Sequence, residues 1–407
     1  MVGAVTDAYG GGNGSLFRVS PPGIESGDFR FLVIGDPGEG DGSQYSLIER
    51  YLELGRHEDV KFLVIASDVI YPAGAMVDYE RNFFMPYKGW RKPIYAIPGN
   101  HDWYDALEGF NANFLEPDAA RAALAARVSA DLHLTSTNEE RINSLLTRAK
   151  ELRALYGIQA AKQHAPFFEI QTGDFALIAI DTGIQRTIDD RQQAWLDAAL
   201  SRSKGKFIMA VVGHPKYAGG VDTSLADPSF AALYHRLEQA EASVLMAGDT
   251  HAFEHYLSQT SGPLVHHFVN GGGGAYLSIG GALAWPENAA TPSWEFYPPP
   301  DALRAKLDAE TPAWKQPMWR WVKTFGAWPV SIETLSAMFD FNQAPFFQSF
   351  MEIRVERSNS RVVLALHGAN GPLRWRDLKT SAEPVSSSAS SDAPVEYVLD
   401  LKRPQAE

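Results

Sequence analysis

The sequence predicts an α/β protein, and three neighbouring segments carry this prediction. Phe29–Asp36 and Lys61–Asp68 are apolar runs that end in an aspartate, which is typical of buried strands. Between them, the segment Ser43–Gly55 places its apolar side chains on one helical face: Leu47, Ile48, Tyr51 and Leu52. A strand, a helix and a strand at this spacing indicate a βαβ unit.

The same pattern continues along the chain. Pro93–Asp102 reads as a third strand. Residues 167–183 predict a hairpin that feeds a buried strand ending at Asp181, and 189–203 predict an amphipathic helix. Three later runs read as strands that end in polar residues or glycine, and a final segment reads as a hairpin that completes the sheet: 206–217, 242–251, 264–274 and 349–368.

Changes in composition suggest how the chain is organised. Residues 1–28 are rich in Gly, Ser and Pro and are expected to be a flexible lead-in, and residues 29–379 are expected to form the domain. Two insertions interrupt it: a helix-forming segment at 104–160, and a segment at 285–345 that carries six tryptophans. This second insertion is expected to be local core, a lid or a partner-binding face. Residues 380–407 are expected to be a low-complexity tail.

Charge and cysteine content limit the functional classes. The net charge of −13 argues against a surface that binds a nucleic-acid backbone, since such surfaces cluster Lys and Arg. An acidic protein that handles phosphates needs local positive charge, which bound metal ions can supply. There are no cysteines, so disulfides and thiolate ligands are excluded. We see no signal peptide and no transmembrane run, so the expectation is a cytoplasmic protein; the oligomeric state is not predicted.

Oxygen and nitrogen ligands follow five of the predicted strands. In layered α/β proteins, sites form where loops leave the carboxyl ends of strands. Six or seven such ligands would suit two hard or borderline cations. The residues are Asp36, Asp68, Asn100 with His101, His214, and Asp249 with His251.

These segments resemble the five ordered motifs of the calcineurin-like metallophosphoesterases. The motifs span roughly residues 29–275, and the resemblance implies a four-layer α/β/β/α metallophosphoesterase sandwich with helical insertions. In order, they are GDPGEG (35–40), SDVIY (67–71), GNHD (99–102), VVGHP (211–215) and GDTHAFEH (248–255).

The first metal site resembles that of the purple acid phosphatases. Gly38 stands where most members of the family have a histidine, and Tyr71 stands three residues after Asp68. The resemblance implies two metal ions, divalent or Fe(III) with a divalent ion, drawn from Fe, Mn, Mg or Zn. It assigns to the first metal Asp36, Asp68, Tyr71 and His251. It assigns to the second metal Asp68, Asn100, His214 and Asp249, with Asp68 bridging both.

Two residues depart from the family pattern. Ser67 replaces a usual glycine, which is a mild steric change. Asp249 replaces a usual histidine and would make the site harder, favouring Mn, Mg or Fe over Zn. It would also add a negative charge, which weakens phosphate binding and makes a bound water less acidic. Alternatively, Asp249 only forms a hydrogen bond with a ligand, and the second metal binds weakly.

The resemblance also implies a mechanism. A hydroxide held between the metals attacks phosphorus in line. His101 stabilises the transition state or protonates the leaving oxygen; the alternative is a structural histidine. Asp102 is expected to orient His101 or its loop. Three further histidines are candidates for contacts behind the ligands or with substrate: His255, His266 and His267.

The leading functional hypothesis is a phosphatase acting on a small phosphomonoester. The same site chemistry also serves a phosphodiesterase or a nucleotide hydrolase, because the loops build the pocket for the leaving group. A third alternative, motivated by Asp249 and the tryptophan-rich insertion, is a catalytically weak metal-binding scaffold.

Overall fold

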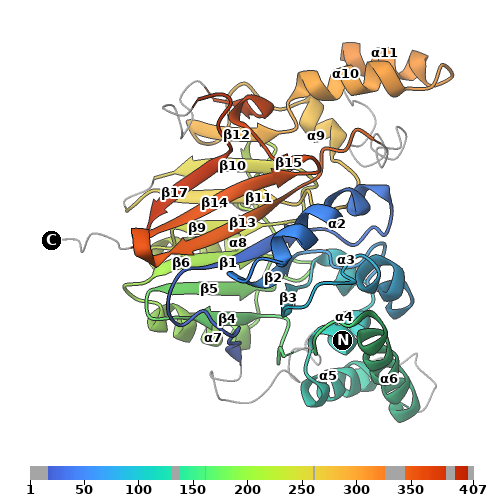
Figure 1. The fold of residues 1–407 in the computed structure, drawn as a ribbon, viewed down its shortest axis with the longest axis vertical. Helices are drawn as coiled ribbons and strands as arrows, with labels where there is room; N and C mark the ends of the chain where they lie inside the picture. The colour runs from blue at the N-terminus through green and yellow to red at the C-terminus, as the bar shows by residue number, and fades with distance from the viewer. Residues whose placement is uncertain are drawn as a thin grey trace.

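Two β-sheets packed face to face form the centre of the molecule (Figure 1). The structure is a computed structural model, and it describes residues 17–130, 138–160, 162–259, 262–325, 344–381 and 390–401. None of the helices in these ranges combines the length and the apolar character that a membrane span requires.

The first sheet begins with the βαβ unit. Strands β1 (Phe29–Gly35), β2 (Val60–Ala66) and β3 (Ile94–Ile97) are parallel neighbours. The predicted C-terminal hairpin extends this sheet, and its first strand pairs antiparallel with β1. The strands beyond β1 are β13 (Ser349–Glu356), β14 (Arg361–Gly368), β15 (Gly371–Pro372) and β17 (Glu396–Asp400).

The second sheet has four parallel strands at its centre: β5 (Phe175–Ile180), β6 (Phe207–Val212), β9 (Val244–Ala247) and β11 (Val265–Asn270). Antiparallel strands flank them: β4 (Phe168–Gln171), β10 (Phe253–Ser258), β12 (Ser293–Tyr297) and β16 (Lys379–Thr380). A separate small hairpin consists of β7 (Tyr217–Ala218) and β8 (Val221–Asp222).

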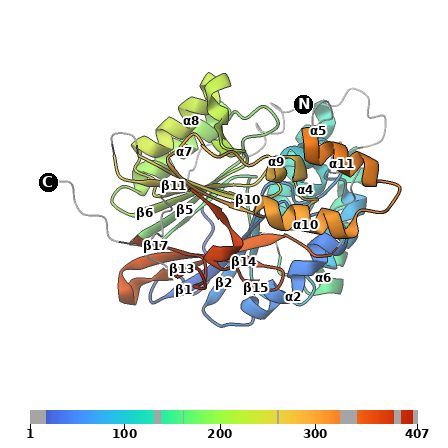
Figure 2. The ribbon, with the colours of Figure 1, turned by 90° about the horizontal axis from the view of Figure 1, so that it is seen from above.

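The alternation of side chains along the strands produces the layers. Phe31 and Val33 of β1 belong to the core between the sheets, which also contains Leu177 and Met209 of the second sheet. Their neighbours on β1 point outward and belong to the core shared with the helices. Helix α2 (Gly42–Gly55) covers the first sheet, and α7 (Asp190–Arg202) and α8 (Pro228–Gln239) cover the second (Figure 2). The predicted α/β/β/α sandwich is therefore confirmed.

Helices occupy both segments that the sequence sets apart. Residues 100–160 carry α3 (Asn100–Trp103), α4 (Glu108–Phe114), α5 (Pro117–Ala130) and α6 (Asn138–Tyr156). The tryptophan-rich segment carries β12, α10 (Pro300–Glu310) and α11 (Gln316–Phe325), preceded by α9 (Ile279–Leu283). Trp285, Trp294 and Trp319 are buried in a local core, while 326–343, with Trp328, lie outside the described residues. The single-turn helices are η2 (Met76–Asp78), η3 (Glu80–Phe84), η4 (Thr223–Ala226), η5 (Arg357–Asn359) and η6 (Trp375–Asp377).

Both ends of the described chain pack against the sandwich. Phe17, Val19 and Ile24 are buried, although they lie within the segment expected to be a flexible lead-in. Strand β17 lies within the expected low-complexity tail, and it pairs with β14 from Arg361 to Ala365. The composition of these segments did not indicate these contacts, because a few apolar residues among polar ones suffice to make them.

The two sheets approach each other closely where β1 and β11 end. The Asn270 side chain donates to the carbonyl oxygen of Val33 at 2.9 Å, and the Gly273 amide donates to that of Gly35 at 2.8 Å. A Cβ atom on Gly35 would lie 2.1 Å from the carbonyl oxygen of Asn270, so only glycine fits at this position. This approach brings the loops that follow β1 and β11 together.

We expect Gly35→Ala to lower the free energy of unfolding by about 2 kcal/mol or more, because the added methyl group overlaps backbone atoms that cannot move independently. Urea unfolding measures the change. Gly173→Ala is the matched control, since no atom lies within 4 Å of the methyl group it would add. Equal stability of the two variants would contradict the close approach.

Candidate metal centre

The predicted ligands lie along the rim where parallel strands of both sheets end. Asp36 follows β1 and Asp68 follows β2 in the first sheet. His214 follows β6, and Asp249 and His251 follow β9 in the second sheet. We call the eight predicted metal-binding and catalytic residues the candidate centre: Asp36, Asp68, Tyr71, Asn100, His101, His214, Asp249 and His251.

Four side chains of this set meet in one buried cluster. One ligand atom each from Asp36, Asp68 and His251 lies within 4.8 Å of the others. The Tyr71 hydroxyl donates to Asp68 Oδ2 at 3.0 Å and lies 2.9 Å from His251 Nε2. Ligand atoms about 2.1 Å from a shared cation, at right angles to one another, are about 3 Å apart. The spacing therefore suits a metal ion.

Burial disfavours the ionised form of the carboxylates, and a bound cation would stabilise that form. Burial raises the pKa of Asp36 well above its usual range, and the neighbouring charges of Asp68 and Asp249 raise it further. Burial likewise raises the pKa of Asp68 to about 6. Asp36 Oδ1 is buried and accepts no hydrogen bond from the described residues. An unpartnered carboxylate oxygen beside a second carboxylate fits a metal ion, which would favour the ionised form of both.

His251 is held in the form that can bind a metal. Its Nδ1 lies 2.9 Å from the carbonyl oxygen of Tyr276, which can only accept, so Nδ1 carries the proton and Nε2 keeps its lone pair. Burial lowers the pKa of His251 to about 4, so the ring is neutral at pH 7. Nε2 is the atom that faces the Tyr71 hydroxyl.

The GNHD segment reaches the same cluster through its backbone. The His101 amide donates to Asp68 Oδ1 at 2.9 Å, and the His101 ring lies 4.4 Å from the Tyr71 ring, centroid to centroid. The ring Nδ1 is 2.6 Å from the carbonyl oxygen of Pro72, which leaves Nε2 as the nitrogen that can bond to a substrate. The Asn100 side-chain nitrogen donates to the Tyr104 hydroxyl at 3.0 Å, so the side-chain oxygen can coordinate a cation.

Asp102 is occupied by backbone amides. Its carboxylate accepts from Val69 at 2.8 Å, Ile70 at 3.3 Å and Gly99 at 3.0 Å. These bonds tie the loop after β2 to the loop after β3. Asp102 therefore fixes the position of Asp68 relative to Asn100.

His214 and Asp249 form the other side of the candidate centre. Asp249 Oδ1 lies 3.8 Å from His214 Nε2, and the Asp249 amide donates to Asp36 Oδ2 at 2.9 Å. Burial lowers the pKa of His214, so the ring is neutral and the 3.8 Å separation is not an ion pair. A carboxylate oxygen and an imidazole nitrogen at this distance can flank one cation. Thr182 Oγ1 holds the His214 ring at Nδ1, at 2.7 Å.

The backbone is strained at these strand ends. Nine described residues other than glycine have a positive φ in the left-handed region, and five of them belong to the candidate centre or its loops: Asp36, Ser67, Asp68, Arg186 and Asp249. Each costs of order 1 kcal/mol or more, so the surrounding contacts must enforce it. Strain concentrated in this way is typical of functional sites.

His255, His266 and His267 lie away from this rim. His255 Nδ1 bonds with Glu295, and its Nε2 is 3.1 Å from His266 Nδ1. His267 Nε2 bonds with Ser258 Oγ at 2.9 Å. His266 precedes the end of β11 by four residues, which is roughly 13 Å along a strand. The strand geometry thus places these histidines in a polar network inside the second sheet, apart from the expected contacts with ligands or substrate.

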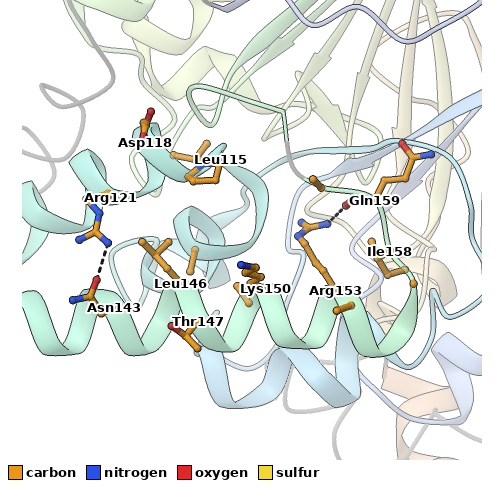
Figure 3. A pocket seen from close by; sticks show the side chains of 16 residues that line it. Leu115, Asp118, Arg121, Asn143, Leu146, Thr147, Lys150, Arg153, Ile158 and Gln159 are labelled. Atoms are coloured by element: carbon orange, nitrogen blue, oxygen red, sulfur yellow. Dashed lines mark hydrogen bonds between the residues drawn. The ribbon is translucent and has the colours of Figure 1, made fainter.

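A pocket of about 820 Å³ lies between α5 and α6, and it does not include the candidate centre (Figure 3). Arg121, Lys150 and Arg153 line it beside apolar side chains. Arg121 bonds to Asn143, and Arg153 donates to the carbonyl oxygens of Gln159 and Asn113. No candidate ligand lines this pocket, so pocket shape alone does not identify the centre.

Four residues near the centre were not predicted from the sequence. Tyr276 orients His251 and Thr182 orients His214. Asp181 accepts from the Trp103 ring nitrogen at 3.1 Å and links the loop after β5 to α3. Arg186 lies 3.7 Å from Asp249 Oδ2. Asp181 ends a predicted strand and Thr182 follows it directly, which is the only signal that could have identified them.

Comparison with known proteins identifies a family. The model of the calcineurin-like phosphoesterases matches residues 29–253, which is more than half of the chain. Among curated proteins, no match was found.

Two solved structures are similar to this chain. GAP50, the anchor in the inner membrane complex of Plasmodium, is 13% identical, with a TM-score of 0.49, 93% of this chain covered and 90% of that chain. The purple acid phosphatase PPD1 from yellow lupin seeds is 11% identical, with a TM-score of 0.45 and 92% of this chain covered. The match spans only 58% of the lupin chain. Likenesses at this level say nothing about activity.

The raised pKa of Asp68 predicts how the stability of the metal-free protein depends on pH. A folded-state pKa of about 6 exceeds the ordinary value of 3.8, so the folded state binds the extra proton. The stabilising contribution is complete below pH 4 and is lost as the pH rises through 6. We expect the wild type to lose about 2–3 kcal/mol relative to Asp68→Asn between pH 4 and 7.

Chemical denaturation of both metal-free proteins across this pH range measures the two free energies of unfolding. Because the other titrating groups are present in both proteins, the difference between the two curves isolates the contribution of Asp68. Parallel curves would contradict a raised pKa. Added metal is expected to reverse the trend for the wild type, because metal binds the ionised carboxylate.

Proposed function

Because the chain belongs to the calcineurin-like phosphoesterase family, we propose that it is a metal-dependent phosphatase that hydrolyses a small phosphomonoester. One observation carries this proposal: buried ligand atoms of Asp36, Asp68 and His251 converge within 4.8 Å from strand ends in two different sheets. A cluster of two buried carboxylates and a neutral imidazole has little structural value without a cation. With cations, it becomes a site for phosphate chemistry.

The candidate ligands divide into two groups that share Asp68. In this proposal, the first cation is held by Asp36, Asp68, Tyr71 and His251. The second is held by Asp68, Asn100, His214 and Asp249. When bound, the two cations would supply an activated water and neutralise the charge on the phosphate oxygens.

The oxygen-rich ligand set bears on the choice of metal. Carboxylates and a phenolate prefer hard cations, so we propose Fe or Mn rather than Zn at the Tyr71 site. Burial and the adjacent Asp68 carboxylate raise the pKa of Tyr71, so the hydroxyl keeps its proton until a strongly polarising cation displaces it. A trivalent iron would do this most readily.

His101 acts on the leaving group in this proposal. The bond between Nδ1 and the carbonyl oxygen of Pro72 fixes the tautomer, and the rings of Tyr71 and Tyr104 lie 4.4 and 5.0 Å from the His101 ring. The imidazole is partly exposed, so a substrate can reach it. A protonated Nε2 could donate to the leaving oxygen as the ester bond breaks.

We expect the protein, loaded with Fe or Mn, to contain two metal ions per chain and to hydrolyse nitrophenyl phosphate faster than bis-nitrophenyl phosphate. Plasma mass spectrometry measures the metal, and nitrophenol release measures turnover. An iron-loaded sample should also absorb visible light through Tyr71, and this band should vanish in Tyr71→Phe. Faster diester hydrolysis would identify a phosphodiesterase, and one metal or none without turnover would identify a scaffold.

For His101→Ala, we expect an unchanged metal content and a fall in kcat of about 10²–10⁴-fold, the contribution typical of general acid catalysis. His235→Ala, which alters an exposed histidine of α8, is the matched control and should leave kcat unchanged. Loss of metal from the His101 variant would instead assign the residue a structural role.

A further inference from the structure

The candidate centre carries an excess of negative charge. Asp36, Asp68 and Asp249 are carboxylates, and a phosphate ester brings further negative charge. Among the ion pairs of the described residues, the pair that joins a Lys or Arg to a candidate ligand is Arg186 Nη2 with Asp249 Oδ2, at 3.7 Å. From this position we propose that Arg186 is a substrate-binding residue whose guanidinium contacts the phosphate group. The inference rests on the proposed function.

The loop that carries Arg186 is anchored at both ends. At its start, Asp181 accepts from the Trp103 ring nitrogen at 3.1 Å, and Thr182 holds His214. The Thr187 amide donates back to the carbonyl oxygen of Thr182 at 3.0 Å and closes the turn. Arg186 itself has a φ of +57°, a strained conformation for a residue with a side chain. The turn thereby holds the arginine beside the second group of ligands.

The guanidinium retains donors for a ligand. At 3.7 Å, its separation from Asp249 exceeds a hydrogen bond, so the charges attract while the N–H groups are not used up. The guanidinium carbon lies 5.7 Å from the centre of the Phe230 ring, which supports one face of the group. The side chain is 37% exposed, so its edge is open to solvent. A planar, supported guanidinium suits two parallel bonds to phosphate oxygens.

The competing explanation is that Arg186 only neutralises Asp249. Asp249 stands where the resembled family has histidine, and a nearby cation would offset the added charge. The two explanations differ in one respect. If Arg186 only neutralises Asp249, it should have no effect on phosphate binding once Asp249 is replaced by histidine. If Arg186 contacts the phosphate, its effect should remain.

The test measures binding of inorganic phosphate to the metal-loaded, full-length protein by titration calorimetry. We expect Arg186→Gln to weaken binding by about tenfold to a hundredfold, the range for loss of a charge-assisted hydrogen bond, with the metal content unchanged. Arg186→Lys keeps the charge but not the planar guanidinium, so its phosphate affinity should lie between those of the wild type and Arg186→Gln. Arg191→Gln, at the exposed start of α7, is the control and should bind like the wild type.

The same measurement in the Asp249→His background separates the two explanations. We expect Arg186→Gln to weaken phosphate binding there by a similar factor. A loss of the effect in that background, or a loss of metal from Arg186→Gln, would overturn the inference in favour of neutralisation. Unchanged phosphate affinity would overturn it too, while metal content and turnover of the wild type would still support the proposed function. If the wild type binds no metal and shows no turnover, both the proposed function and the role of Arg186 are wrong.

Discussion

The main physical constraint on this structure is the burial of two carboxylates, those of Asp36 and Asp68, which have almost no contact with solvent. Each is less than 2% exposed, and their pKa values are raised because burial and the charges of neighbouring carboxylates disfavour the charged form. Protein dipoles compensate only in part: Asp68 accepts from the His101 amide and the Tyr71 hydroxyl, and Asp36 accepts from the Asp249 amide. The remaining electrostatic demand is what a cation at this position would meet.

The fold produces this situation by bringing two sheets together at their carboxyl-end rims. Asn270 and Gly273 of the second sheet bond to the backbone of β1, and the absence of a side chain at Gly35 allows the approach. Glycine also permits contact at the centre itself, since a Cβ atom on Gly248 would lie 2.5 Å from Asp36 Oδ2. Close packing and left-handed backbone at the strand ends thus place charged side chains where solvent cannot reach them. The strained backbone and the buried carboxylates at this rim both lower the free energy of unfolding, but they place the candidate ligands together.

Asp249 and Arg186 bring opposite charges to one side of the candidate centre. In the proposed centre, the Asp249 carboxylate would make the second group of ligands harder and more negative than a histidine would, and Arg186 supplies a positive charge 3.7 Å away. Such a site would differ from one with neutral imidazoles in both metal preference and phosphate affinity. The difference arises from two residues that are 63 positions apart in the chain (249 − 186).

The sequence alone determined the α/β class, the strands and the rim at which the polar residues gather, because apolar runs closed by Asp, Asn or His are typical of buried strands whose ends are polar. Without the family resemblance, the residue types did not distinguish His251, which faces the cluster, from His255, which lies within β10, since both are histidines close together in the chain. Nor could the sequence reveal that Tyr276 orients His251 or that Arg186 reaches Asp249. Those relations depend on the approach of two sheets and on the direction of a turn, which are decided by packing between distant segments. Tertiary structure also decided that Phe17, Val19 and β17 join the core, since burial depends on what neighbouring surfaces leave open rather than on local composition.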